Sequence, residues 1–154
     1  MVSLEGMKSK MEGVIIKERE RHTDERGFFS EIFRFAEEFK NLKVGQLSHS
    51  LVKEGVIKGW HGHKEQSQWN YVVTGKARVV LYDNRYKSAS YQMSQEFRIG
   101  DDVKPQAYFF SPGILHGYKC LEKMHIIYVT SEVYNPEEEV KIMMSHPEVK
   151  NCIW

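Results

Sequence analysis

Two histidines separated by one residue are the feature of this sequence with the clearest capacity for chemistry. They stand in the segment Gly59-Trp60-His61-Gly62-His63. On an extended strand, side chains two residues apart leave the same face, so both imidazoles would point into one cavity or onto one surface. Imidazole titrates near neutral pH and serves as a general base, a general acid or a metal ligand. The pair therefore indicates proton-transfer or metal chemistry.

The spacing around this pair adds to its meaning. Five residues separate Gly55 from His61, four separate His63 from Gln68, and six separate Gln68 from Gly75. A later segment, Pro112-Gly113-Ile114-Leu115-His116, brings a further histidine. This arrangement resembles the signature of the cupin double-stranded β-helix, with Gln68 where metal-binding cupins usually place Glu. We therefore expect an all-β jelly-roll barrel.

The elements that must position these histidines read as short strands rich in Val, Ile, Tyr and Phe, separated by turn residues. Within 76–83, Ala77, Val79 and Leu81 alternate with Arg78, Val80 and Tyr82, which predicts two distinct faces. Gly75 lies between two strong strand signals and predicts an antiparallel hairpin there. The predicted strands are Gly13–Lys17, Phe28–Phe33, Val44–Val52, Val56–His63, Gln68–Thr74, Lys76–Asp83, Ser90–Phe97, Ala107–Phe110 and His125–Thr130.

Only two segments read as short helices, Arg34–Lys40 and Pro136–Lys141. The second begins with Glu137, Glu138 and Glu139, and acidic residues are favourable in the first turn of a helix. We interpret it as a surface helix without a functional role. With no repeat or linker in view, the sequence predicts one cupin domain over residues 1–154.

Composition excludes several classes of protein. The 154 residues carry 22 Lys+Arg against 21 Asp+Glu, a formal charge of +1, so neither nucleic acid nor an anionic membrane is an expected partner. No apolar run reaches the roughly 18 residues of a membrane-spanning helix. The N-terminus lacks the apolar core of a signal peptide. Cys120 and Cys152 lack CxxC spacing, which favours a reducing, cytoplasmic location.

Among cupins, the sequence is most similar to the dTDP-4-dehydrorhamnose 3,5-epimerase family. The resemblance spans most of the chain, and the matching segments occur in the family's order at close to its spacing. They are Asp24–Glu31, Gly45–Ser50, Gly55–His61, Asp83-Asn84-Arg85 with Ser88, Ser111–Tyr118 and Tyr128–Pro136.

This resemblance implies a cofactor-independent enzyme that inverts carbons next to the C4 ketone of a nucleotide-linked 4-keto-6-deoxyhexose, in deoxysugar and cell-surface polysaccharide synthesis. It implies His61 as the base and Tyr128 as the acid, with His63 as a candidate second proton shuttle. It also implies a homodimer in which an N-terminal strand crosses to the partner. The residues it places around the substrate are Arg26 and Lys58 at the diphosphate, Gln46, Ser48, Asn70 and His116 along the sugar, and Phe29 and Glu31 from the first segment.

Elementary chemistry agrees with these roles. A proton next to a ketone is acidic only through the enolate that its removal forms, so the site needs a base that works near neutral pH. Inversion needs a proton donor on the opposite face, and a phenol with an ordinary pKa of about 10 keeps its proton at pH 7. The enolate oxygen needs a hydrogen-bond donor or a positive neighbour, and the diphosphate needs Arg or Lys.

The sequence departs from the family pattern at several positions. Asn70 stands where the family has Lys, Lys58 where it has Arg, Ser48 where it has Asn, and Val79 where it has an acid. The family also pairs its catalytic His with an Asp from a later segment, which this sequence does not reach before Trp154. Another acid would have to orient His61, and Asp24 and Glu65 are the nearest candidates in sequence.

Three alternatives remain at the level of sequence. His63 makes the segment similar to that of sugar 3,4-ketoisomerases, which use a histidine pair to move a proton between adjacent carbons. His61, His63, Gln68 and His116 could instead hold a metal for a dioxygenase or isomerase, although a neutral Gln is a poor ligand. A sugar-nucleotide-binding protein without turnover is the third. We favour the epimerase, which needs neither a metal nor a cofactor.

Overall fold

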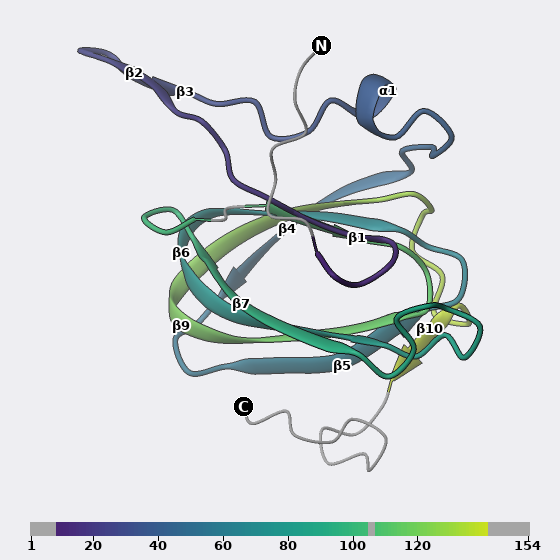
Figure 1. Cartoon of the computed structure of the whole chain (residues 1–154). Helices are drawn as coiled ribbons and strands as arrows, with labels where there is room; N and C mark the ends of the chain where they lie inside the picture. Colours follow the sequence, from purple (N-terminus) through teal and green to yellow (C-terminus); the bar gives the residue numbers. More distant parts are fainter. Residues whose placement is uncertain (1–8, 105–106, 142–154) are drawn as a thin grey trace.

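The computed structural model describes residues 9–104 and 107–141 and is nearly all β. Most strands curl into a barrel, while a separate two-stranded hairpin extends away from it and one short helix lies above it (Figure 1). The elements are β1 Val14–Lys17, β2 His22–Asp24, β3 Gly27–Phe29, α1 Phe35–Glu38, β4 Gln46–Val52, β5 Ile57–His63, β6 Gln68–Asp83, β7 Ser94–Gly100, β8 Ala107–Phe110, β9 Ile114–Thr130 and β10 Glu139–Lys141.

Two long strands, β6 and β9, lie at the centre of the sheet and pair with each other antiparallel. The eight-stranded sheet runs β1-β8-β6-β9-β5-β10, with β4 also on β9 and β7 also on β6. The strands β5, β6, β8 and β9 therefore surround one interior, where side chains from alternate positions meet. This arrangement confirms the predicted cupin-type jelly roll. It places His61 and His63 on β5, which pairs with β9.

The predicted hairpin at Gly75 is wrong, because β6 continues through this residue as one strand. Both halves of β6 pair with β9: Asn70 lies opposite Tyr128, and Lys76 lies opposite Glu122. The pairing register shifts between Val72 and Ala77, so Gly75 marks a bulge where the two strands bend together. Gly75 has a φ of +88°, and a Cβ there would clash with the Lys123 carbonyl oxygen. The glycine fits a close backbone approach rather than a turn.

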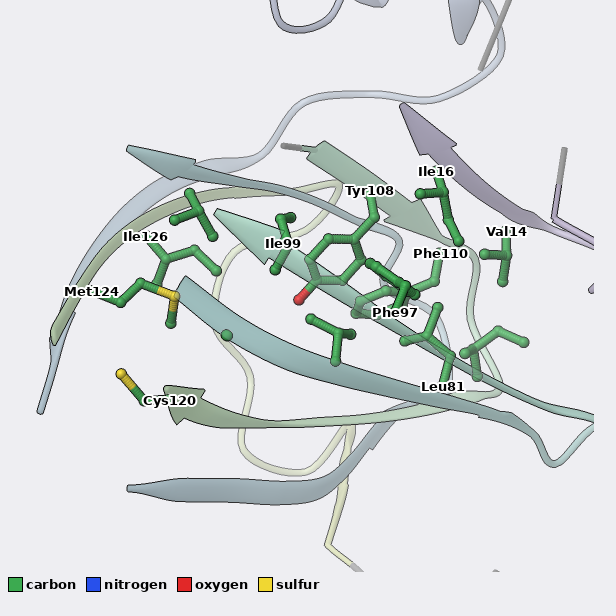
Figure 2. Packing of buried hydrophobic residues seen from close by; sticks show 14 of the residues in the cluster. Val14, Ile16, Leu81, Phe97, Ile99, Tyr108, Phe110, Cys120, Met124 and Ile126 are labelled. Carbon is green, nitrogen blue, oxygen red and sulfur yellow. The ribbon is translucent and has the colours of Figure 1, made fainter. Parts of the chain in front are cut away.

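The apolar core fills the barrel beyond the histidines. The predicted alternation in β6 is confirmed: Ala77, Val79 and Leu81 enter the main core, while Val80 and Tyr82 pack with Trp60 and Leu115 on the other face. Figure 2 shows aromatic rings in the middle of the main core and Cys120 with Met124 at one end. These tightly packed side chains close the interior on one side, which leaves space at the other for a cavity.

Two other expectations need correction. The segment read as the helix Pro136–Lys141 instead forms a turn followed by β10, which pairs antiparallel with β5. The predicted strand Phe28–Phe33 is shorter and ends at Phe29, because it pairs only with the three residues of β2. The helix expected within Arg34–Lys40 is present as α1. The predicted single domain covers residues 1–154. Of these, residues 1–8, 105–106 and 142–154, which include Cys152, lie outside the part of the chain that the structure describes.

Candidate active site

A cavity of about 260 Å³ opens between β4, β5, β6 and β9. Polar side chains line it from several strands, including Gln46 from β4, Lys58 from β5, Gln68 from β6 and Thr130 from β9. Tyr134, Asn135, Glu138 and Glu139 add a wall from the segment that leads into β10. This volume is near the lower end of the range of volumes found for small-molecule binding sites.

His61 and His63 line this cavity together, as their spacing predicts. Each imidazole makes one short hydrogen bond to a glutamate. The Nδ1 atom of His61 lies 2.8 Å from Oε1 of Glu139, and Nδ1 of His63 lies 2.8 Å from Oε2 of Glu138. An ionised carboxylate only accepts hydrogen bonds, so each ring donates from Nδ1 and carries its lone pair on Nε2 in its neutral form. The cavity thus holds two separate histidine–carboxylate pairs.

The two glutamates are residues that the sequence interpretation assigned to a surface helix. Glu139 begins β10 and lies opposite His63 in the strand register, yet its side chain reaches diagonally to His61. Glu138 precedes the strand, where its backbone carbonyl accepts a bond from the Lys64 amide. The two acids expected to orient His61 have other partners: Asp24 binds Arg26, and Glu65 donates its backbone N–H to Glu138. Glu139 is therefore the carboxylate partner of His61.

Glu138 is buried and well supplied with donors. Its Oε1 accepts from the backbone N–H groups of Glu65 and Gln66, at 2.7 and 2.9 Å, and its Oε2 accepts from His63. Burial opposes ionisation, but the two backbone donors and the His63 ring together hold the pKa of Glu138 below its ordinary value. Glu138 is therefore a carboxylate at neutral pH.

His116 contacts both of these histidines. Its ring centroid lies 5.9 Å from that of His61 and 5.6 Å from that of His63, and its ring stacks on Phe110 at 4.3 Å. Burial, together with the neighbouring rings of His63 and His61, lowers the pKa of His116 well below its ordinary value. Its Nδ1 has no hydrogen-bond partner within the described residues. His116 is thus a neutral imidazole against which a substrate can pack.

Phenols line the cavity from β9 and β8. Tyr128 lies opposite Ser48 on β4 and Asn70 on β6, and its side chain is half-buried. Tyr118 and Tyr108 also line the cavity, and burial raises the pKa of both above the ordinary value for tyrosine. The cavity therefore combines imidazole bases with protonated phenols.

Three of the expected sugar-binding residues make hydrogen bonds to other groups of the chain. Asn70 lines the cavity, but its Oδ1 accepts from Gln68 at 2.7 Å and its Nδ2 donates to the Tyr108 carbonyl at 3.5 Å. Ser48 does not line the cavity, and its hydroxyl accepts a 2.9 Å bond from the Gln46 amide. Gln46 in turn accepts from the Tyr134 backbone N–H.

Three more of the expected residues lie outside the cavity of this chain. The turn of the β2–β3 hairpin carries Arg26, whose side chain is 83 % exposed and pairs with Asp24. Phe29, at the end of the hairpin, is 64 % exposed, and Glu31 pairs with Arg34. Figure 1 shows this hairpin extended beyond the barrel. These residues do not meet His61 within one chain.

Sequence reasoning missed Glu138, Glu139 and Gln66 as members of the site. The one available signal was the acidic run itself, 75 residues or more from the histidines, which is equally typical of a helix start.

Across residues 9–104 and 107–141, no group of three or more His, Cys, Asp or Glu side chains is arranged to hold a metal ion. Over the same ranges no helix is long and apolar enough to cross a membrane.

Comparisons with known proteins identify the family of this chain. The profile of the dTDP-4-dehydrorhamnose 3,5-epimerase family matches residues 8–152. The chain is 37 % identical over 146 residues to the spore coat polysaccharide biosynthesis protein SpsL of Bacillus subtilis, spanning 94 % of this chain and 90 % of that protein. It is 30 % identical over 155 residues to a dTDP-4-dehydrorhamnose 3,5-epimerase of Methanothermobacter thermautotrophicus, spanning 97 % and 83 %.

Solved structures give the same answer for the fold. NovW, a 4-keto-6-deoxy sugar epimerase from Streptomyces spheroides, matches with a TM-score of 0.82 and 29 % identity, over 92 % of this chain and 75 % of that one. The rmlC epimerase of Mycobacterium tuberculosis matches with a TM-score of 0.85 and 24 % identity, over 94 % and 76 %. With the profile spanning nearly the whole sequence, this chain belongs to the dTDP-4-dehydrorhamnose 3,5-epimerase family.

Proposed function

We propose that this protein is an epimerase of a nucleoside-diphosphate 4-keto-6-deoxyhexose, and that its product enters polysaccharide synthesis. The observation that carries the proposal is the His61–Glu139 pair in the same cavity as Tyr128. The family relatives named for 3,5-epimerisation and for spore coat polysaccharide synthesis support the substrate class and the pathway.

The proposed reaction divides the proton transfers between these groups. Nε2 of His61 takes a proton from a carbon beside the C4 ketone, and the electron pair moves onto the ketone oxygen to form an enolate. Glu139 stabilises the imidazolium that results. Tyr128 returns a proton to the other face of that carbon, and the ketone re-forms with the configuration inverted. The ketone of the substrate itself makes the neighbouring C–H acidic, so this chemistry requires no added cofactor.

The β2–β3 hairpin supports a homodimer. Phe28 and Phe29 are 54 % and 64 % exposed on a hairpin that extends away from the barrel, and exposed aromatic rings of this kind are typical of an interface. We place Arg26 and Phe29 at the cavity of the partner subunit, where Arg26 would join Lys58 at the diphosphate. The free, buried thiol of Cys120 agrees with action in the cytoplasm.

Proton NMR in deuterated water tests the proposed reaction. The protein is incubated with dTDP-4-keto-6-deoxyglucose, with and without a chelator. We expect loss of the C3 or C5 proton signal, insensitive to chelator, together with signals of the epimerised product, and we expect His61→Ala to abolish the exchange while the fold remains intact. Formation of a 3-keto product would indicate ketoisomerisation instead. Tight binding without exchange would indicate a sugar-nucleotide-binding protein.

Complementation between two inactive variants tests the dimer. His61→Ala lacks the base, whereas Arg26→Ala lacks a phosphate ligand. If the hairpin crosses, a mixed dimer contains one cavity with both residues intact, so an equal mixture should recover about a quarter of the wild-type activity after subunit exchange. If Arg26 serves its own cavity, or serves none, the mixture will be no more active than the variants alone.

A further inference from the structure

The pair His63–Glu138 has no part in the reaction described so far, although it repeats the geometry of His61–Glu139. Both Nδ1-to-carboxylate distances are 2.8 Å, and both rings line the cavity. The side chain of His63 is 13 % exposed and that of Glu138 is 9 % exposed. A buried carboxylate placed against one imidazole is an arrangement that orients a base, and the cavity has two of them.

The donors around Glu138 determine which nitrogen of His63 is available. Because Glu138 is ionised, the ring must donate from Nδ1, and its Nε2 carries the lone pair. The described contact of Nε2 is with the Gln66 amide at 3.4 Å, close to the limit for a hydrogen bond. A substrate hydrogen can therefore replace this contact at little cost. The ring also stacks on His116, with an angle of 19° between the planes, which fixes its orientation.

A purely structural role accounts for only half of what Glu138 does. Its Oε1 joins the Glu65 and Gln66 backbone to the segment before β10, which helps to hold the turn after β5. Its Oε2 binds His63, which the turn does not require. Another side chain able to fill the space at His63 would leave the backbone bonds in place. The second oxygen therefore points to a role for the imidazole itself.

The two bases lie along one strand and line the same cavity. Side chains two residues apart on a strand stand roughly 6.6 Å apart. In a 4-keto sugar the two acidic carbons, C3 and C5, lie on either side of the ketone. Two bases along one wall can therefore address the two carbons without the sugar turning over in the cavity.

Resting on the proposed function, we propose that His63, oriented by Glu138, is a second catalytic base and that deprotonation of C3 and C5 is divided between His61 and His63. At its carbon, Nε2 of His63 accepts the proton while the C–H electron pair forms the enolate. A donor on the other face then returns a proton to that carbon, and the enolate collapses to the ketone. The imidazolium finally loses its proton to water. No oxidant, reductant or co-reactant enters the balance.

Carbon-resolved exchange tests this division. Initial rates of deuterium incorporation at C3 and at C5 are measured by NMR for wild type, His61→Asn, His63→Asn and Glu138→Gln. We expect His63→Asn to slow exchange at one carbon by about 100-fold or more and to leave the other within about threefold, with His61→Asn giving the opposite pattern. Exchange retained at one carbon shows in the same sample that the variant is folded.

The positioning role of Glu138 needs its own readout. We expect Glu138→Gln to slow exchange at the carbon served by His63 and to change the pH dependence of that rate alone. His49→Asn is the control for histidine substitution, because His49 lies on β4 against His125 and outside the cavity. It should leave both rates unchanged.

Several results would overturn the division. Equal slowing at both carbons in His63→Asn would make His63 an enolate or binding residue, and no slowing would make it structural. Wild-type exchange at only one carbon would refute the division while leaving the epimerase function intact. Absence of exchange at both carbons in the wild type would refute the proposed function itself.

Discussion

The carboxylate of Glu139 is the feature whose removal most directly tests how the site works. We expect Glu139→Gln to reduce turnover by about 100- to 1000-fold with little effect on substrate binding. Glu139 binds His61 at Nδ1, whereas the proposed reaction uses the other ring nitrogen, Nε2, to contact the substrate. The loss should therefore be in kcat, and KM should stay within about threefold.

The magnitude follows from the 2.8 Å contact between two partly buried groups, with 33 % of the His61 side chain and 17 % of the Glu139 side chain exposed. A hydrogen bond to a charged partner is worth about 1.5–3 kcal/mol, and in this case it is strongest when the imidazole gains a proton. At about 1.4 kcal/mol per tenfold, that is about 10- to 150-fold in rate. Glutamine can also donate its amide N–H to Nδ1, which would place the ring proton on Nε2 and block the base. This wrong tautomer accounts for the remaining loss.

Initial rates of solvent exchange and of product formation, measured over a range of substrate concentrations, separate kcat from KM. Glu137→Gln is the matched control: it makes the same change two residues away, at an exposed residue that does not line the cavity. It should remain within about twofold of wild type, because exposed charges contribute little. The reasoning fails if Glu139→Gln keeps more than half of the wild-type kcat, or if its effect is confined to KM.

Three more outcomes follow from the same structure. Tyr128→Phe removes a proton donor without touching the base, so epimerised product should fall by about 100-fold or more while solvent exchange continues; parallel loss of both would contradict the assignment. His116 is protonated at an ordinary pKa of 6.5 only when unfolded, so stability should fall as the pH drops below 6.5. Urea titrations give the unfolding free energy at pH 7 and at pH 5.5. The loss between these two pH values should be about 1 kcal/mol smaller in His116→Asn than in the wild type, and an equal loss in both proteins would contradict the argument. Asp83 is fully buried and binds Arg85, Ser88 and Ser90. Asp83→Asn should therefore lower the unfolding free energy by about 3 kcal/mol in calorimetry, and a change below about 0.5 kcal/mol would refute the role of this network.

The features that the sequence predicted correctly are local ones. Alternation places residues two apart on one face whatever the rest of the chain does, so the shared orientation of His61 and His63 and the inward face of Ala77, Val79 and Leu81 could be predicted. The turn Asp24–Gly27, which joins β2 to β3, is local in the same sense, because Asp24 binds the Arg26 backbone within the turn.

The errors concern contacts that local patterns do not encode. A glycine between two apolar strands is typical of a hairpin, yet the same glycine also fits a bulge in one long strand, and pairing with β9 decides between them. Three consecutive acids after a proline are typical of a helix start. Here Glu139 instead enters a strand, because β5 offers it an edge to pair with and the adjacent histidines bind both carboxylates. Both outcomes are set by partners distant in sequence.

The position of those acids has a consequence for the whole site. Histidines two apart on β5 would need carboxylates two apart on a regular neighbouring strand, since adjacent residues point to opposite faces. Glu138 and Glu139 are adjacent, and both reach the histidines only because Glu138 precedes β10, in the turn that Asn135 and Lys64 hold by backbone bonds. One short segment thus orients both bases. A change that shifts this segment should impair both histidines together, whereas a change at either glutamate should impair one, and that difference separates an effect on the scaffold from an effect on the chemistry.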